Sequence, residues 1–360
     1  MKTYRNLFSD LMSFDNLLMA SNQARRRKSR KPVVSAFDMD LEKNIWQLHD
    51  ELMTKTYKPG PYYEFTIHEY KTRLISAAPY RDRVMHHAIC NIIEPIFERS
   101  FIFDSYACRK DKGTHKAVDR YTKFSRHNIY VLKCDIRKYF PSIDLEILKS
   151  ILFTIIKDED VQWLIRLIID GSNPQIPIYE YFYGDDLFTP FERRRGIPIG
   201  NLTSQFFANV YLNGLDHFIK ENLHCHFYIR YCDDFVIFHN DKNRLHEVKD
   251  EIVNYLEPLR LKLHAKKCHI MAVKSGIDFL GYRVFPDHRL LREANGYRFQ
   301  RKIPRLIKQL SGTETEQFHA SQSVRAWIAH ASHADTYGLQ RALLKDTPFN
   351  EMLIQIYNLN

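Results

Sequence analysis

Two adjacent carboxylates, Asp233 and Asp234, stand in the apolar stretch YIRYCDDFVIF at residues 228–238. The residues around the pair are mostly aromatic or β-branched, which is typical of two buried strands joined by a turn. Neighbouring carboxylates repel each other, and burying one without a partner costs several kcal/mol. We therefore expect positively charged groups to lie against this pair.

A third carboxylate, Asp135, ends the apolar segment NIYVLKCD at residues 128–135, which is predicted to be a buried strand. Beside a hairpin that carries Asp233 and Asp234, it would gather three carboxylates at one end of an antiparallel sheet. Mg²⁺ prefers such hard oxygen ligands, usually one or two carboxylates together with substrate phosphates. Two ions about 3.5 to 4 Å apart can activate a 3′ hydroxyl and stabilise departing pyrophosphate. The sequence thus predicts a two-Mg²⁺ site on these acids.

A second acidic pair, Asp185 and Asp186, ends the string YGDD at residues 183–186. This string lies in a polar stretch, and its glycine and paired aspartates are typical of a hairpin loop. The pair at 233–234 has apolar strands on both sides instead. We predict that residues 183–186 form a loop and that the catalytic pair is Asp233 and Asp234.

The elements that would position these acids can be read from hydrophobic periodicity and turn residues. The order of strands and helices indicates an α+β body followed by a helical tail. The predicted elements are helices over 41–53, 82–98 and 242–257, a hairpin through Tyr63, Phe65, Ile67, Leu74 and Ile75, the strand over 128–135, a helix capped by Asn201, a short strand FLGYRVF at 279–285, and only helices beyond about residue 286.

At this point the sequence resembles the reverse transcriptases. The string CDIRKYF is similar to their first catalytic motif, GIPIGNLTSQFFANVYLN to the second, YCDD to their Y-x-D-D box and FLGYRV to the primer-grip strand. The resemblance covers roughly residues 50–340, and the motifs keep the family's order. It implies a right-hand polymerase, with fingers and an antiparallel palm sheet flanked by helices over 1–285 and a helical thumb over 286–360.

The second motif indicates which group of reverse transcriptases the chain resembles. Most reverse transcriptases carry Gln-Gly, three residues and then Ser-Pro, whereas this chain has Ile199-Gly200, three residues and then Ser204-Gln205. The wording IGNLTSQ resembles the reverse transcriptases of diversity-generating retroelements, which copy a template-repeat RNA into DNA while misreading adenines. A group II intron-like or defence-associated reverse transcriptase of ordinary fidelity is the alternative.

The resemblance also implies roles for single residues. Asp135, Asp233 and Asp234 would hold the two Mg²⁺ ions. Lys71 and Arg73 would hold the triphosphate, Phe140 would exclude a ribose 2′ hydroxyl, and Gly200 would let the backbone approach the nucleotide. Lys266 and Lys267 fall where related polymerases place a general acid, and Lys267 is the candidate. The alternative is that these adjacent lysines, at the start of a strand, are simply solvated. Template contacts would come from Arg109, Lys112, Arg193, Arg194 and Arg195, although these residues could equally be surface charges, and the three arginines could simply balance Asp185, Asp186 and Glu192.

The isoleucine at position 199 has a consequence that does not depend on the family. A glutamine there could hydrogen-bond the incoming nucleotide or the template base, whereas isoleucine offers only bulk. Discrimination that relies on a polar contact should therefore fall, and fidelity with it. The alternative is that Ile199 merely packs under Pro198 and the following helix.

The charge and the cysteine content indicate what kind of partner the protein binds and in which cellular compartment it works. Lys and Arg exceed Asp and Glu by ten, with 53 against 43, and this favours a polyanionic partner such as nucleic acid. The resemblance implies template RNA, a DNA or RNA primer, deoxynucleoside triphosphates and a small basic, oligomeric accessory protein. The six cysteines form no CxxC pair, and no apolar run approaches the ~18 residues of a membrane span. We expect a soluble cytoplasmic protein, bacterial or phage-encoded, with no membrane partner.

Two other classes of function use part of the same pattern. A non-catalytic RNA-binding relative would gain nothing from three mutually repelling carboxylates. A metal-dependent nuclease could use the acids, but it would need neither Phe140 nor the Gly200 loop.

Overall fold

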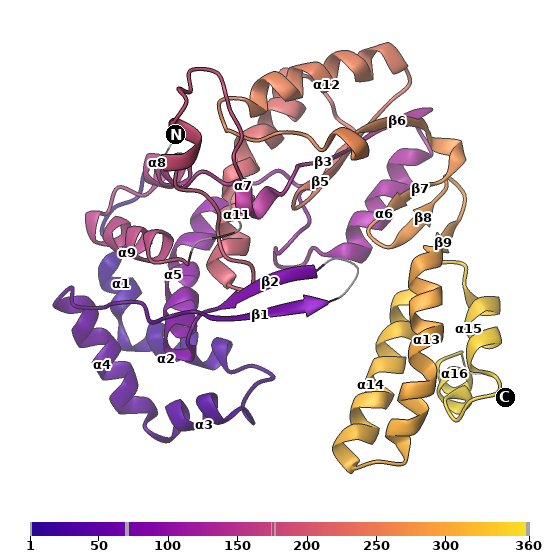
Figure 1. The fold of residues 1–360 in the computed structure, drawn as a ribbon, viewed down its shortest axis with the longest axis horizontal. Coiled ribbons are helices and arrows are strands. Elements are labelled where there is room, and N and C mark those ends of the chain that lie inside the picture. The colour runs from indigo at the N-terminus through magenta and orange to yellow at the C-terminus, as the bar shows by residue number, and fades with distance from the viewer. Residues whose placement is uncertain (1, 69–71, 174, 176–177, 358–360) are drawn as a thin grey trace.

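The computed structural model describes residues 2–68, 72–173, 175 and 178–357, and it has a mixed α+β fold (Figure 1). Its centre is a four-stranded antiparallel sheet, called the central sheet below, with the strand order β4-β5-β3-β6. Its strands are β3 (Tyr130–Asp135), β4 (Tyr228–Tyr231), β5 (Asp234–His239) and β6 (His269–Ala272).

The strands of the central sheet contribute to two separate cores because successive side chains point to opposite faces. In β5, Phe235 and Ile237 belong to the large main core, whereas Val236 and Phe238 belong to a second core. Both faces are therefore covered, and the strand reads as a continuous apolar run. The helices nearest to the sheet are α6 (Thr114–Ser125), α11 (Leu202–His217) and α12 (Lys242–Leu256).

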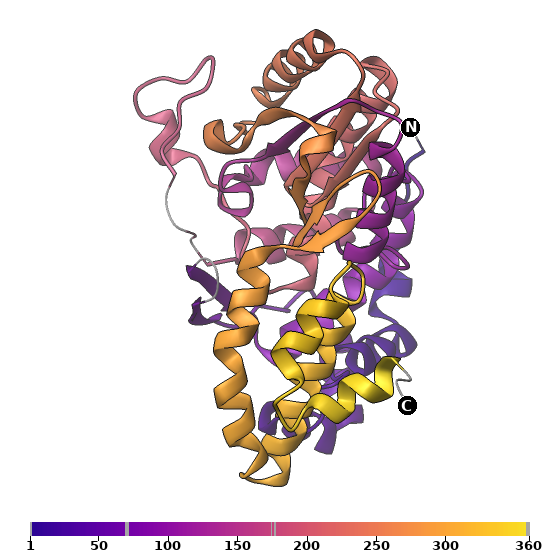
Figure 2. The same ribbon diagram turned by 90° about the vertical axis from the view of Figure 1, so that its right-hand side faces the viewer.

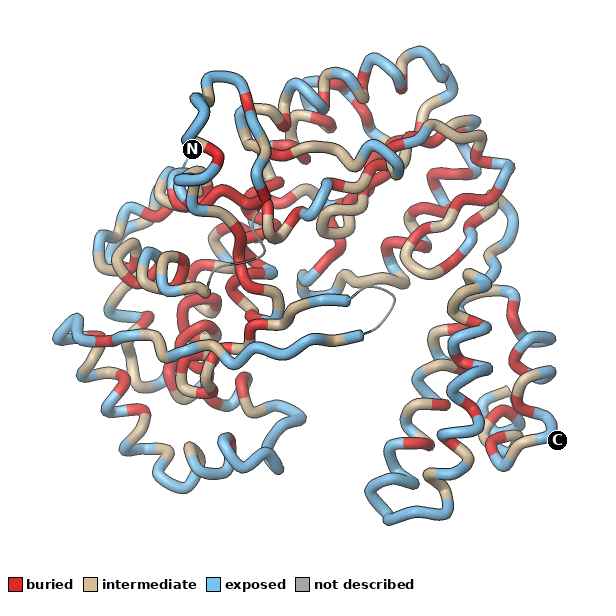
Figure 3. Tube along the Cα trace, in the orientation of Figure 1, coloured by how far each residue is buried: buried red, intermediate tan, exposed pale blue. Residues whose placement is uncertain are grey.

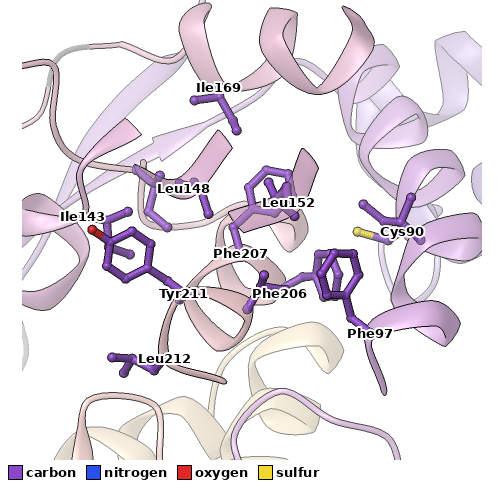
Figure 4. Close-up of a cluster of buried hydrophobic side chains, with 14 of the residues drawn as sticks. Cys90, Phe97, Ile143, Leu148, Leu152, Ile169, Phe206, Phe207, Tyr211 and Leu212 are labelled. Carbon is purple, nitrogen blue, oxygen red and sulfur yellow. The ribbon is translucent and has the colours of Figure 1, made fainter. Parts of the chain in front are cut away.

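The main core joins the central sheet to the N-terminal helices. Phe97 and Phe206 meet edge to face, with ring centroids 5.6 Å apart, beside Leu148, Leu152 and Phe207 (Figure 4). Besides α11 and α12, the helices that share this core are α1 (Phe8–Met12), α2 (Phe14–Ala24), α3 (Pro32–Met39), α4 (Leu41–Met53), α5 (Tyr80–Glu98), α7 (Tyr139–Ser142), α8 (Leu145–Ile155) and α9 (Glu159–Asp170). The short helix α10 (Thr189–Glu192) lies outside it.

An exposed hairpin of β1 (Tyr63–His68) and β2 (Thr72–Ala77) projects from this body (Figures 1 and 3). A third sheet consists of β7 (Ile277–Phe279), β8 (Tyr282–Val284) and β9 (Arg289–Leu291). It leads into a C-terminal helical bundle, which Figure 1 shows apart from the N-terminal helices and which faces the viewer in Figure 2. The bundle consists of α13 (Glu293–Leu310), α14 (Glu314–Ala331), α15 (Tyr337–Leu344) and α16 (Asn350–Tyr357).

The C-terminal helical bundle has a core of its own, in which Phe299 stacks on Trp327 with ring centroids 3.8 Å apart. This is the region predicted as the thumb, although the division at residue 285 stays a prediction. Among the described residues, no helix is both long enough and apolar enough to cross a bilayer.

Two predicted elements differ from the structure. The string FLGYRVF was expected to be one strand, but Leu280 and Gly281 take φ values of +47° and +96° and turn the chain into the β7–β8 hairpin. Strand β9 lies beyond residue 286, where only helices were expected, because it completes the sheet that this hairpin begins.

Asn201 was expected to cap α11, but its side chain makes no capping hydrogen bond. Its amide instead accepts from the backbone N–H of Ala78 at 3.2 Å and donates to the carbonyl of Ser76 at 3.1 Å. The neighbouring carbonyl of Ile199 accepts from the N–H of Ser76 at 3.0 Å. These bonds fix the end of the β1–β2 hairpin to the start of α11.

Gly200 lies at this junction with φ +121°, a value that side-chain-bearing residues rarely adopt. A Cβ there would stand 2.9 Å from Cγ2 of Ile75. The glycine is therefore required both by its conformation and by the close approach of β2.

We predict that Gly200→Ala lowers the free energy of unfolding by about 2–3 kcal/mol. The loss would have two causes: alanine disfavours a positive φ, and its methyl group would be packed too closely against Ile75. Gly184→Ala is the control, because Gly184 also has positive φ but has no atom near its missing Cβ, so it should cost only about 1 kcal/mol. Chemical unfolding of both variants measures the difference. Equal losses would show that β2 yields freely to the added methyl.

Candidate active site

The three predicted acids meet at one end of the central sheet. Asp135, the last residue of β3, is paired directly with Asp234, the first residue of β5. The turn from β4 to β5 holds Asp233, whose carbonyl accepts from the N–H of Ile136 at 3.1 Å. The residue before it, Cys232, has φ +59°. The antiparallel register thus places the acids as the sequence predicts.

Two lysines supply the positive charge that the acidic pair requires. Nζ of Lys267 lies 2.7 Å from both carboxylate oxygens of Asp135. Nζ of Lys133 lies 3.8 Å from Oδ2 of Asp234 and donates to the carbonyl of Asp278 at 2.6 Å. The acids are therefore partly neutralised by the protein itself.

The compensation is incomplete at Asp233 and Asp234. Burial raises the pKa of Asp233, and the negative charge of Asp135 raises it further. Burial likewise raises the pKa of Asp234 to about 6, although Lys133 opposes the shift. Among the described atoms, Oδ1 of Asp234 is buried without a hydrogen-bond partner. The two lysines therefore neutralise the negative charge of these carboxylates only in part.

The acids suit a hard divalent cation by their chemistry. All three offer carboxylate oxygens, the ligands that Mg²⁺ prefers. Oδ1 of Asp234, which has no hydrogen-bond partner among the described atoms, could bind such a cation. In the described part of the chain, no three His, Cys, Asp or Glu side chains are gathered closely enough to form a ready metal site. At Asp135, both carboxylate oxygens already accept from Nζ of Lys267.

Asp135 and Asp234 line a cleft of about 680 Å³. Arg73 from β2 lines the same cleft, so the exposed hairpin and the central sheet both contribute to it. The other basic residues of the lining are Lys133, Lys266, Lys267, Arg283 and Arg292. Such a cleft attracts a polyanion to the carboxylates.

The comparison with protein families fits this geometry. Residues 58–284 match the family described as reverse transcriptase (RNA-dependent DNA polymerase). The chain belongs to the reverse transcriptase family.

Several relatives of this reverse transcriptase are encoded by introns. Protein YkfC of Escherichia coli K12 is 24% identical over 326 residues, which cover 79% of this chain and 80% of YkfC. The group II intron-encoded protein LtrA of Lactococcus lactis is 25% identical over 183 residues, or 50% of this chain and 29% of LtrA. An uncharacterized 91 kDa protein in the cob intron of Schizosaccharomyces pombe is 27% identical, over 62% of this chain and 27% of its own. This chain thus covers less than a third of the length of these two larger relatives.

Among solved structures, apo telomerase from Candida tropicalis, truncated from its C-terminal domain, is similar with a TM-score of 0.46 and 14% identity. The similarity covers 67% of this reverse transcriptase and 57% of the telomerase chain.

Three of the other predicted nucleotide-binding residues, Phe140, Ile199 and Gly200, do not line this cleft. Lys71 falls outside the described residues. Phe140 is half-buried on α7, where its carbonyl accepts from the N–H of Ile197 at 3.1 Å. Ile199 is half-buried and Gly200 is exposed, and both contact β2 through their backbones. Of the predicted nucleotide-binding residues that the structure describes, only Arg73 lines the cleft with the carboxylates.

Two of the predicted template contacts point into the protein. The Arg109 side chain is only 6% exposed, and it forms a bidentate ion pair with Glu98. Arg193 is 3% exposed and pairs with Asp185, which is the charge-balancing alternative left open by the sequence. Both guanidinium groups thus bind carboxylates of the fold in this structure, and their contact with a template stays a prediction.

The remaining three basic residues are more accessible. Arg194 is half-exposed and binds Asp170 at 2.9 Å, and Nη2 of Arg195 donates to the carbonyl of Pro190 at 2.6 Å. Nζ of Lys112 lies 3.4 Å from the ring centroid of Phe103. Their contact with nucleic acid stays a prediction.

The YGDD string is a loop, as predicted. Tyr183 is almost fully exposed, and Oδ1 of Asp186 accepts from the N–H groups of Phe188 and Thr189. Within the described residues 178–201, no strand flanks the string. Its acids are used for local capping and for the Arg193 ion pair.

Lys133 was missed by the sequence reasoning. It stands two residues before Asp135 on β3, and residues i and i+2 of a strand share one face. That spacing alone would have placed a lysine beside the acids.

We predict that Asp234→Asn stabilises the metal-free protein at pH 8 by about 2–3 kcal/mol, because the ionised carboxylate is unfavourable where it is buried. A pKa raised on folding means that Asp234 contributes stability below pH 4, and this contribution is lost as the pH rises through about 6. The gain of the variant should therefore vanish near pH 4. Unfolding in the presence of a chelator, as a function of pH, measures it.

Asp186→Asn is the matched control, and its effect on stability at pH 8 should have the opposite sign. Hydrogen bonds from Thr189 and Phe188 lower the pKa of Asp186, so this variant should lose stability at pH 8. A loss of stability in Asp234→Asn at pH 8 would contradict the electrostatic description of the site.

Proposed function

We propose that this reverse transcriptase copies a template RNA into DNA, with Asp135, Asp233 and Asp234 as the residues that hold two Mg²⁺ ions. One observation carries the proposal: the register that pairs Asp135 with Asp234 leaves a buried carboxylate oxygen without a partner, in a cleft lined with cationic side chains. Bound Mg²⁺ would lower the pKa of the primer 3′ hydroxyl and neutralise charge on the phosphates.

The chain's own residues would orient the reactants. The Arg73 guanidinium can hold the triphosphate because its planar donors match phosphate oxygens. The primer 3′ oxygen then forms a bond to the α-phosphorus as the bond to pyrophosphate breaks. Lys267, which lines the same cleft, would give a proton to the departing pyrophosphate. Phe140 would exclude the ribose 2′ hydroxyl.

The finer proposal is that the enzyme serves a diversity-generating retroelement. Its support is the string IGNLTSQ and the apolar Ile199 in place of a hydrogen-bonding glutamine. Its substrates would be template-repeat RNA, a DNA or RNA primer and deoxynucleoside triphosphates, and a small basic oligomeric protein would present the RNA.

The similarity to intron-encoded proteins, LtrA among them, favours a second candidate function. This is a group II intron-like reverse transcriptase of ordinary fidelity. The two candidates share the catalytic acids and differ in error rate, so fidelity separates them.

We predict that Asp233→Asn lowers primer extension on an RNA template by about 100-fold or more, because the lost metal ligand supplies several kcal/mol to the transition state. The variant should stay folded, since it removes a buried charge. Extension with Mg²⁺ and all four deoxynucleotides, together with thermal unfolding, provides the measurement.

Asp186→Asn applies the same substitution to the other acidic pair and should extend primers within about twofold of the wild type. Full activity in a folded Asp233→Asn protein would refute the assignment of the acids. Cleavage of labelled RNA with Mg²⁺ alone, and no extension, would indicate a nuclease instead.

We predict that Ile199→Gln lowers misincorporation opposite template adenines by about tenfold, which corresponds to one hydrogen bond of about 1.4 kcal/mol. Ile199→Leu is the control, because it keeps an apolar side chain of the same size and should keep the wild-type errors. Sequencing of the extension products measures both. An even, low error rate in the wild type would favour the group II intron-like candidate and make Ile199 a packing residue.

A further inference from the structure

A fully buried ion pair lies directly behind the catalytic turn. Arg230 on β4 and Asp216 on α11 both have side chains that are 0% exposed. Nε of Arg230 donates to Oδ1 of Asp216 at 2.7 Å, and Nη2 donates to Oδ2 at 2.6 Å. The Tyr228 hydroxyl adds a third hydrogen bond to Asp216 at 2.7 Å. The carboxylate thus fixes the orientation of the guanidinium plane.

The remaining nitrogen of Arg230 reaches the turn itself. Nη1 donates to the carbonyl of Cys232 at 3.2 Å and to Oδ1 of Asn209 at 3.0 Å. Cys232 precedes Asp233 and has φ +59°. A non-glycine residue keeps that conformation only where its surroundings impose it. The hydrogen bond from Arg230 is one such constraint.

The backbone of Arg230 is held as firmly as its side chain. Its N–H donates to the carbonyl of Asp104 at 3.0 Å, and its carbonyl accepts from the N–H of Tyr106 at 2.9 Å. Nδ2 of Asn209 donates to the carbonyl of Ala107 at 2.8 Å. The network therefore joins α11, β4 and residues 104–107 around one guanidinium.

Stability alone does not explain this arrangement, because well-packed apolar side chains often replace a buried ion pair without loss of stability. An apolar pair could not donate to the carbonyl of Cys232. We infer that Arg230, oriented by Asp216 and Asn209, is a positioning residue that fixes the Cys232–Asp233 turn and thereby the location of the Asp233 carboxylate. The inference rests on the proposed function of Asp233.

The test is the double variant Arg230→Met with Asp216→Val, which removes both charges and changes the total side-chain volume little. We expect a melting temperature within a few degrees of wild type, KM values within about twofold, and kcat lowered by about tenfold or more. Backbone amide exchange should rise at residues 231–234 and remain at the wild-type level in the rest of the central sheet. The exchange measurement does not depend on catalysis.

Leu164→Ala is the control for a loss of stability alone. Leu164 is fully buried on α9, which packs against α8, so this variant should melt earlier while kcat and exchange at 231–234 are retained. If the double variant does not fold, Arg230→Lys is the second test. It keeps the charge opposite Asp216, but a single ammonium cannot make the whole set of contacts, and it should lower kcat and loosen the turn in the same way.

Each outcome has a defined meaning. Wild-type kcat and exchange in a folded double variant would overturn the inference. Faster exchange spread over the whole central sheet would also overturn it, since that is the mark of a purely structural pair. Faster exchange confined to 231–234, in a protein whose wild type does not extend primers, would support the control of the turn and refute the proposed function.

Discussion

The pairing of β3 with β5 is the constraint on which the site depends. In an antiparallel ladder a slip of one residue moves every side chain to the opposite face. The observed register sets Asp135 against Asp234 and also sends Phe235 and Val236 into different cores. A slip would bury Asp234 in the main core and expose apolar side chains to the cleft. The apolar packing of the sheet therefore fixes the positions of the carboxylates.

Electrostatic balance at this site comes from residues with separate tasks. Lys133 and Lys267 offset the charge of the acids from within the cleft, whereas Arg230 and Asp216 cancel each other out of contact with solvent. The first pair of cations faces a space that a polyanion can enter. The second arrangement is closed and defines only geometry. The site thus combines two lysines that a bound polyanion can reach with a buried ion pair that it cannot reach.

Much of this organisation can be predicted from the sequence, because it depends on local pattern. The run YIRYCDDFVIF shows both strands and the acidic turn, and helix 41–53 agrees with α4. Tertiary partners are harder to predict. Nothing in the local sequence shows that Asn201 binds β2 instead of capping α11, or that Arg109 and Arg193 have carboxylates within the fold. Charged residues in basic strings look alike until their neighbours are known.

The strand order has a consequence for folding during synthesis on the ribosome. Strand β3 pairs on one side with β5 and on the other with β6, so Tyr130 faces both His239 and Ala272. During synthesis from the N-terminus, both edges of β3 remain without their partners until those later segments have left the ribosome. Unpaired apolar strands invite association with other chains. The C-terminal helical bundle, with a core drawn from residues 299–353 alone, has no such delay. Strand β3 is therefore open to such association until β5 and β6 have been made.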